Sequence, residues 1–102
     1  MSKFHNIKKT IDGITFQSRR EADRYQDLKL MLKAGMIDKL ELQPKYSLDV
    51  NGIHIANYFA DFAYLDLQRN YVVEDAKGIK TPAYKLKKKL MLACHGIEIQ
   101  EV

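Results

Sequence analysis

Three charged residues lie in segments that otherwise resemble β-strands, and their types and spacing suit metal-assisted chemistry. Asp61 lies among aromatic residues, and Asp75 and Lys77 lie two residues apart in a later segment, so they share one face of a strand. A buried carboxylate needs a partner, an ion or water. Carboxylates from neighbouring strands offer Mg²⁺ the oxygen ligands it prefers, and a nearby lysine can orient or deprotonate a water molecule aimed at a phosphate. These residues predict phosphodiester hydrolysis; the alternative for the pair is an exposed ion pair at a strand end.

Strands must position these side chains, and the hydrophobic pattern predicts where they run. Alternating apolar residues predict strand segments over residues 40–50, 53–65 and 71–77. Asn51-Gly52 predicts a tight turn between the first two, because a type I′ turn needs positive φ at both central residues. The three strands are therefore expected to form an antiparallel meander.

Two helices enclose this meander in the sequence. Ser18 begins a capping-box pattern, and the helical spacing of apolar residues continues until Gly35. Thr81 and Pro82 suit the N-cap and first position of a second helix, which Gly96 closes. A short last strand follows. The order α-β-β-β-α-β predicts an α/β fold with a mixed four-stranded sheet flanked by two helices.

The loop between the second and third strands decides which carboxylates share a face. A four-residue loop over 67–70 would place Asp61 with Glu74 and leave Asp75 and Lys77 on the other side. A loop of three or five residues, or a bulge, would place Asp61 with Asp75 and Lys77. We expect the odd loop or the bulge, because bulges are common beside active sites and only Asp75 has the two-residue spacing to Lys77. Glu74 is then expected to face solvent.

Basic residues are concentrated in two parts of the chain, whose net charge is +4. Residues 1–20 carry five Lys or Arg against one acid, and residues 77–89 carry six Lys and no acid. This pattern suits a polyanionic partner, although a solvated helix face is the alternative. On the second helix we expect one stripe to face the sheet: Ala83, Leu86, Leu90, Met91 and Cys94. The residues expected to contact the DNA backbone are Lys80, Lys85, Lys88, Lys89, Arg19 and Arg20.

Composition excludes several classes of protein. A chain of 102 residues with 46% hydrophobic residues suits one globular domain, which we expect over 13–102 after a basic arm over 1–12. The single Cys94 cannot form an internal disulfide, and three scattered His show no zinc spacing, so these residues are expected to be structural or exposed. No apolar run suits a membrane span, and the polar start lacks a signal-peptide core, which predicts a cytoplasmic protein.

An aspartate followed by a (D/E)-x-K triplet on the next strand, within this order of elements, resembles the PD-(D/E)XK nuclease superfamily. The segments that carry a narrower likeness are Phe16-x-Ser18-x-x-Glu21, Leu42-Gln43-Pro44, Ala60-Asp61-Phe62, Val73-Glu74-Asp75-x-Lys77-Gly78 and Thr81-Pro82. They resemble a small phage-associated family of that superfamily, long catalogued as a domain of unknown function. The layout is also similar to phage junction resolvases of the endonuclease I type. The resemblance covers nearly the whole chain from Gly13 on and implies a restriction-endonuclease-like core.

The resemblance also implies a site. The acids of the superfamily fall on Glu21, Asp61 and Asp75, which would hold Mg²⁺ with Mn²⁺ as a substitute, and its lysine falls on Lys77, which would position or deprotonate the attacking water. Glu21 has an alternative role, because it can close the capping box instead. Ala60 stands where a Pro often precedes the aspartate, and the acid of the triplet is Asp rather than the commoner Glu.

The implied function is a magnesium-dependent endodeoxyribonuclease that acts on branched DNA during phage replication or recombination, similar to a Holliday junction resolvase. Such enzymes act as dimers, and the small chain favours a homodimer or a partner protein. We expect no membrane partner and no small-molecule cofactor, in the cytoplasm of a bacterial host or phage-infected cell. Two alternatives stay open: a non-catalytic DNA-binding or recombination-accessory module of the same fold, and an RNA-directed or tRNA-processing nuclease.

Overall fold

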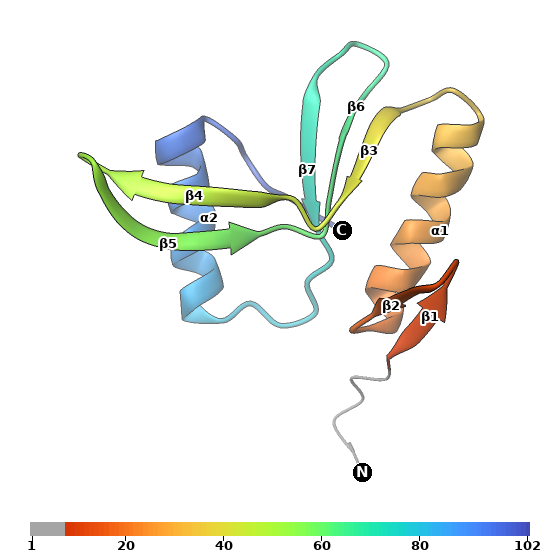
Figure 1. Ribbon diagram of the computed structural model, residues 1–102, viewed down its shortest axis with the longest axis horizontal. Coiled ribbons are helices and arrows are strands. Elements are labelled where there is room, and N and C mark those ends of the chain that lie inside the picture. Colours follow the sequence, from red (N-terminus) through yellow and green to blue (C-terminus); the bar gives the residue numbers. More distant parts are fainter. Residues whose placement is uncertain (1–7) are drawn as a thin grey trace.

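A computed structural model describes residues 8–102 and shows short strands arranged around two longer helices (Figure 1). In chain order the elements are β1 (Lys9–Ile11), β2 (Ile14–Phe16), α1 (Arg19–Lys33), β3 (Asp38–Leu42), β4 (Lys45–Val50), β5 (Ile53–Phe59), β6 (Phe62–Leu65), β7 (Tyr71–Asp75), α2 (Pro82–His95) and β8 (Gln100–Glu101). The expected arm over 1–12 lies partly outside the described residues, as does His5. Its last part forms β1, which pairs with β2 in a hairpin.

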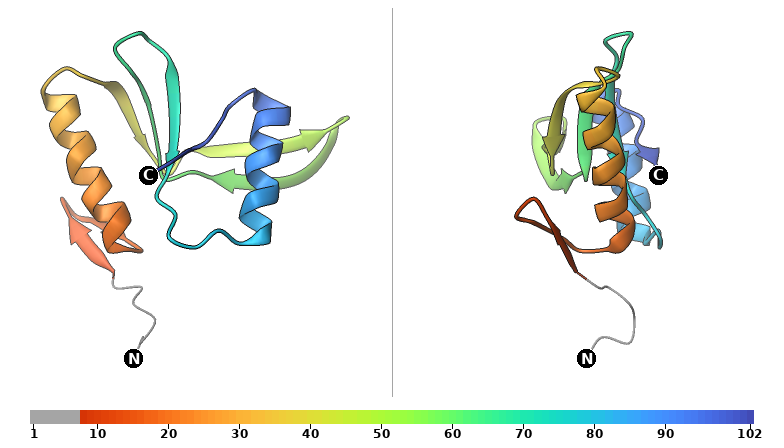
Figure 2. Two further views of the ribbon diagram at one scale, coloured as in Figure 1. Left: turned by 180° about the vertical axis from the view of Figure 1, so that it is seen from behind. Right: turned by 90° about the vertical axis from the view of Figure 1, so that its right-hand side faces the viewer.

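A mixed four-stranded sheet in the order β3-β6-β7-β8 forms the centre of the fold. β6 is antiparallel to β3 and β7, whereas β7 and β8 run parallel. Figures 1 and 2 show α1 and α2 on opposite sides of this sheet, with the β4–β5 hairpin beside α2. The expected α/β fold with two helices and a mixed four-stranded sheet is confirmed. In the described part of the chain, no helix is long and apolar enough to cross a membrane.

The segment expected as one strand over 53–65 is interrupted at Ala60 and Asp61, where the chain changes its pairing partner. β4 pairs with β5, and β3 pairs with β6. Pro44 has no N–H to donate to a strand ladder, and Gln43 has a φ of 51°. Ala60 N–H donates to Pro44 O (3.1 Å), and Gln43 N–H donates to Asp61 O (2.9 Å). The β4–β5 hairpin therefore leaves the central sheet where Asp61 lies.

Both helices begin and end where their capping residues predict. The Ser18 side chain accepts a hydrogen bond from the first turn of α1, and the Thr81 side chain does the same for α2. Pro82 occupies the first turn of α2, as its missing N–H allows. Gly96 ends α2 with a φ of 67°, a left-handed conformation that glycine adopts without the steric penalty of a side chain.

Each helix buries a different face of the fold. α1 packs with Ala22, Tyr25 and Leu28 in one cluster of buried side chains, beside β6. α2 contributes Tyr84 and Met91 to a second cluster, between the β4–β5 hairpin and the central sheet. The first cluster takes Phe62 and Tyr64 of β6 and the second takes Ala63, so the two clusters lie on opposite faces of the central sheet.

The expected apolar stripe of α2 is partly wrong. Leu90 and Cys94 are half-buried and Met91 is fully buried, but Ala83 and Leu86 face solvent, with Leu86 57% exposed. The helix is turned so that residues two turns apart, 84 and 91, point inward, which rotates the buried face by about one residue. Tyr84 replaces Leu86 as the buried anchor because its ring packs beside Tyr58.

Candidate functional site

The loop that joins β6 to β7 contains an odd number of residues, as expected. Leu65 pairs with Tyr71, and five residues lie between them. The same register places Asp61, which immediately precedes β6, beside Asp75 at the end of β7. Asp61 N–H donates to Glu74 O (3.1 Å), which joins the two strands at this point. The prediction that Asp61 lies with Asp75, and not across the sheet from it, is confirmed.

Asp75 is a fully buried carboxylate with incomplete hydrogen bonding. Tyr58 OH donates to its Oδ2 atom, and Lys77 Nζ lies 3.8 Å from the same oxygen. Its Oδ1 atom is buried and has no hydrogen-bond partner among the described residues. Burial, followed by hydrogen bonding to Asp61, raises the pKa of Asp75 to about 7. A nearby positive charge would therefore stabilise the ionised form of this carboxyl group.

Asp61 provides the second carboxylate of the pair. Its Oδ2 atom accepts a hydrogen bond from Ala76 N–H (2.8 Å). Burial raises its pKa, while hydrogen bonds from Asp75 and Ala76 oppose that effect. Each aspartate thus shifts the pKa of the other, and the bond to Ala76 holds the Asp61 side chain at the end of β7.

Lys77 is positioned by two contacts. Its Nζ atom lies 4.8 Å from the centroid of the Tyr84 ring, a cation–π distance, and 3.8 Å from Asp75 Oδ2. The Lys77 side chain is 30% exposed, so its ammonium group is reachable from solvent. Asp75 and Lys77 are therefore not an exposed strand-end pair, because the carboxylate is buried and only the lysine reaches the surface.

Glu21 lies in the first turn of α1 and is 6% exposed. Its N–H donates to Ser18 Oγ (3.1 Å), which is one half of the capping box. The return bond from its carboxylate to Ser18 N–H is not among the contacts of the described residues. Burial raises the Glu21 pKa and the charge of Asp75 raises it further, while hydrogen bonding from the Gln17 backbone opposes the shift. The Glu21 carboxylate is thus close enough to Asp75 for the two charges to interact.

These side chains meet at one cavity of about 330 Å³. The residues that line it are Gln17, Ser18, Glu21, Gln43, Asp61, Ala76 and Lys77. Asp75 does not line the cavity but is buried beside Asp61 in the register of β6 and β7. Gln43 lines the cavity, and its backbone N–H donates to Asp61 O. The structure therefore brings together all four residues expected at the site.

The donor set suits a hard divalent cation. Across residues 8–102, no group of three or more His, Cys, Asp or Glu side chains is arranged as a metal site. The buried Asp75 Oδ1 atom, however, lacks the partner that a buried anionic oxygen requires. Mg²⁺ is bound in proteins by one or two carboxylates together with water and substrate phosphate. Asp61 and Asp75, with Glu21 nearby, fit that coordination.

The expectation that Glu74 faces solvent is wrong. Glu74 is 2% exposed and accepts two hydrogen bonds from Arg24, at 2.8 and 2.7 Å, and a third from Tyr64 OH. It points toward α1, on the face opposite Asp75, because successive side chains of β7 alternate. Arg24 and Glu74 are 50 residues apart in the sequence, so no local spacing predicted this pair.

Three lysines of α2 and one from the loop before it line a second cavity of about 400 Å³. Lys80, Lys85, Lys88 and Lys89 all line it, as do Leu92, Glu98, Ile99 and Glu101. Lys88 is half-buried and its ammonium group lies beside Glu101 of β8, so its side chain points toward the central sheet. The sequence analysis missed Glu101, which forms ion pairs with two of these lysines, and it missed Tyr58 and Tyr84 as partners of the carboxylate site.

Arg19 and Arg20 lie away from the lysine cavity. They line a shallow pocket at the start of α1 together with Arg24, and Arg20 Nη1 donates to Val102 O (3.2 Å). The expected DNA contacts therefore form two basic regions. One is the lysine cavity of α2, and the other is the arginine pair that begins the helix carrying Glu21.

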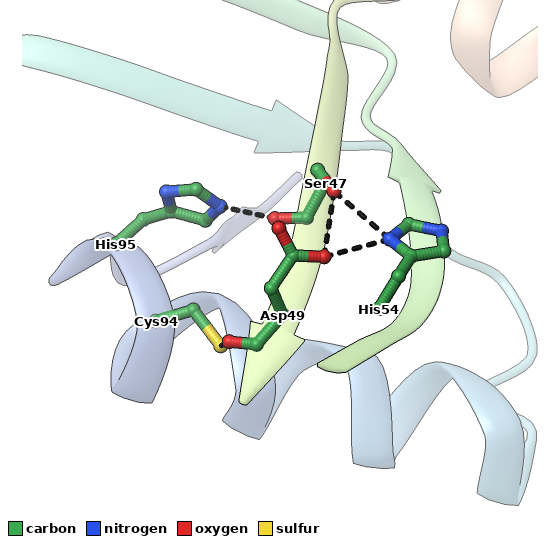
Figure 3. Close-up of polar contacts among 5 residues, drawn as sticks. All are labelled: Ser47, Asp49, His54, Cys94 and His95. Atoms are coloured by element: carbon green, nitrogen blue, oxygen red, sulfur yellow. Dashed lines mark hydrogen bonds and ion pairs between the residues drawn. The ribbon is translucent and has the colours of Figure 1, made fainter. Parts of the chain in front are cut away.

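A separate polar cluster joins the end of α2 to β4 (Figure 3). Ser47 Oγ and Asp49 Oδ1 both contact the same nitrogen of His54, Nδ1, at 3.0 and 2.7 Å. A nucleophile–base–acid relay needs the two partners on different ring nitrogens, so this cluster is not one. Cys94 Sγ donates to Asp49 O, and His95 Nε2 contacts Ser47 O (2.7 Å). These residues fasten the hairpin to α2.

Comparison with known proteins identifies a family without an assigned activity. A family model described as "Protein of unknown function (DUF1064)" matches residues 1–99 of the chain. No curated protein and no solved structure matches it. Any statement about activity therefore depends on the geometry of the site described above.

Proposed function

The chain belongs to the DUF1064 family of proteins of unknown function, and we propose that it is a metal-dependent endodeoxyribonuclease. One observation carries the proposal: Asp61 and Asp75 lie side by side where β6 and β7 meet, beside Lys77, with an unsatisfied buried oxygen on Asp75. We propose further that the core is restriction-endonuclease-like and of the PD-(D/E)XK type. The aspartate before β6 and the acid-x-lysine triplet at the end of β7 support that assignment.

The residues at the cavity have separate roles in this proposal. Mg²⁺, or Mn²⁺ in its place, would be held by Asp61, Asp75 and Glu21, and when bound it would polarise the scissile phosphate and make water more acidic. Lys77 reaches the same cavity and holds the attacking water at its Nζ atom, while the Tyr84 ring limits where that ammonium group can lie. The protein thus promotes direct attack of water on phosphorus.

The DNA backbone would be bound beside this cavity. Lys80, Lys85, Lys88 and Lys89 line one pocket, and each phosphate that such lysines neutralise releases counterions and strengthens binding at low salt. Arg19 and Arg20 begin the helix that carries Glu21 and would contact the backbone on the other side.

We propose branched DNA as the preferred substrate, in phage replication or recombination within the bacterial cytoplasm. A chain of 102 residues covers only a short stretch of duplex, so we propose that it acts as a homodimer or with a partner protein. These finer proposals rest on the resemblance to junction resolvases of similar layout.

Cleavage assays with matched variants test the proposal. Wild-type protein is incubated with Mg²⁺ or Mn²⁺ and plasmid, single-stranded or four-way-junction DNA. Asp75→Asn and Lys77→Gln should each lower the cleavage rate by about a hundredfold or more. Glu41→Gln and Lys33→Gln remove the same kinds of charge at exposed positions outside both basic pockets and should cleave as the wild type does.

Three results would contradict the proposal. These are that the wild type cleaves none of these substrates with either metal, that the two site variants retain full activity, or that activity persists in EDTA. Metal-independent DNA binding without cleavage would instead favour a non-catalytic DNA-binding module. Faster cleavage of RNA substrates than of DNA would favour the RNA-directed nuclease.

A further inference from the structure

Glu101, on β8, is surrounded by three hydrogen-bond donors that converge on its carboxylate. Lys80 Nζ lies 2.9 Å from Oε1, Lys88 Nζ lies 3.1 Å from Oε2, and Tyr84 OH donates to Oε2 at 2.8 Å. These donors come from the loop before α2, from the helix and from its first turn. Two ammonium groups and a hydroxyl around one anion are what a phosphate group requires.

We call Lys80, Lys88 and Tyr84 around Glu101 the cradle, and it lies next to the proposed active site. Glu101 and Asp75 are paired in the parallel register of β8 and β7, so their side chains leave the same face of the sheet on strands about 4.8 Å apart. Tyr84 connects the two places, because its hydroxyl contacts Glu101 and its ring lies under the Lys77 ammonium group. A phosphate bound at the cradle would therefore be a close neighbour of a phosphate at Asp75.

We propose that Lys80, Lys88 and Tyr84 form a subsite for a DNA backbone phosphate, and that Glu101 occupies it in the free protein until DNA displaces the carboxylate. This inference rests on the proposed nuclease function, whose substrate it positions. Glu101 competes with DNA phosphate for the two lysines and Tyr84. Weakly bound or misplaced polyanions do not displace it, whereas a DNA strand aligned along β7 and β8 does. It selects for DNA that also reaches the carboxylate cavity.

The exposure and charge of the cradle support displacement. Glu101 is 22% exposed, while Lys80 and Lys88 are 48% and 36% exposed, so all three side chains border solvent and can exchange partners. Bonds from the two lysines and Tyr84 lower the Glu101 pKa to about 2, which keeps the carboxylate ionised at neutral pH. Lys85 and Lys89 line the same cavity and would attract the incoming phosphate.

DNA binding in Ca²⁺, which allows binding to be measured apart from cleavage, tests the inference. Glu101→Gln keeps the size of the side chain and an acceptor for Tyr84, but releases both lysines. Glu98→Gln removes one negative charge from the same cavity and is the matched control. We expect Glu101→Gln to bind a fluorescent duplex about three- to tenfold more tightly than Glu98→Gln does. Its affinity should also depend more steeply on salt, by about one to two units of slope.

Adding Lys80→Gln and Lys88→Gln to Glu101→Gln should remove the gain. Equal affinities for Glu101→Gln and Glu98→Gln, or no duplex binding by any variant at low salt, would overturn the inference. A gain that survives loss of both lysines would also overturn it, since the cradle would not be the source.

Wild-type protein gives a second measurement that does not depend on the folding of a variant. The carboxyl carbon of Glu101 is followed by NMR at pH 7 as duplex is added, and displacement requires its signal to shift. An unchanged signal while the duplex binds would contradict the inference. The nuclease proposal is tested separately, by the metal-dependent cleavage assay. If the wild type does not cleave DNA but Glu101→Gln still binds duplex more tightly, the phosphate subsite is supported and the nuclease proposal is contradicted.

Discussion

The buried Asp75 carboxyl group should make the metal-free protein less stable as pH rises. Burial, with hydrogen bonding to Asp61, raises its pKa from 3.8 to about 7. An unfolded chain releases this proton near its ordinary pKa, whereas the folded protein keeps it until about pH 7, so the folded state binds more protons between these values. The free energy of unfolding therefore falls from about pH 4 to about pH 7, and the full loss is present above that range.

Asp75→Asn should remove most of this loss. A difference of about 3 pKa units corresponds to about 4 kcal/mol, and the Asn amide sacrifices part of that gain because its own buried donors need partners. We expect the variant to be about 2–3 kcal/mol more stable than the wild type at pH 8 and nearly equal to it below pH 4. The same substitution is expected to lower the cleavage rate, so stability and activity should change in opposite directions.

Urea denaturation in EDTA at pH 4 and pH 8 measures the effect. Asp49→Asn is the control, because the bond to His54 lowers the Asp49 pKa, and a lowered carboxyl pKa stabilises the fold above its ordinary value. That variant should gain no stability at pH 8. If Asp75→Asn is no more stable than the wild type at pH 8, or if its advantage is as large at pH 4, the Asp75 carboxyl group is not the buried acid inferred here.

Three further predictions follow from contacts around the site and the fold. Tyr58→Phe removes the donor to Asp75 Oδ2 and should lower kcat by about ten- to hundredfold with little change in KM, measured by steady-state cleavage. Arg24→Ala leaves Glu74 buried without its ion-pair partner and should lower the free energy of unfolding by about 3–5 kcal/mol in urea, and the double variant with Glu74→Leu should recover much of it. Mg²⁺ should raise the melting temperature of the wild type more than that of Asp75→Asn, because only a folded site binds the ion; equal shifts would contradict the metal site.

Local sequence signals predicted the helix ends and the contact between the two aspartates. Ser18, Thr81 and Gly96 each act within one turn of their helix, so their effect needs no knowledge of the rest of the fold. The position of Asp61 beside Asp75 followed from the odd number of residues in the loop between β6 and β7. Side chains of a strand alternate between faces, so a loop one residue longer or shorter would place Asp61 on the other face.

Features that depend on distant segments were not predictable in this way. The rotation of α2 is set by which residues of the β4–β5 hairpin it meets, so Tyr84 became the anchor in place of Leu86. The contact between Glu101 and Lys80 joins β8 to the loop before α2, and no spacing within either segment announces it. The break at Asp61 arises because β3 and β4 have different partners.

Two consecutive acidic residues of β7 differ in how completely their carboxylates are hydrogen-bonded. Glu74 and Asp75 are both buried, and burying a carboxylate is unfavourable for each. The fold gives Glu74 two bonds from Arg24 and one from Tyr64, which is nearly full compensation. Asp75 receives one bond from Tyr58, a lysine at 3.8 Å and no partner for Oδ1 within the described residues. The same strand thus contains a completed ion pair on its α1 face and an incomplete one beside the cavity, and a divalent cation is the partner that would complete it.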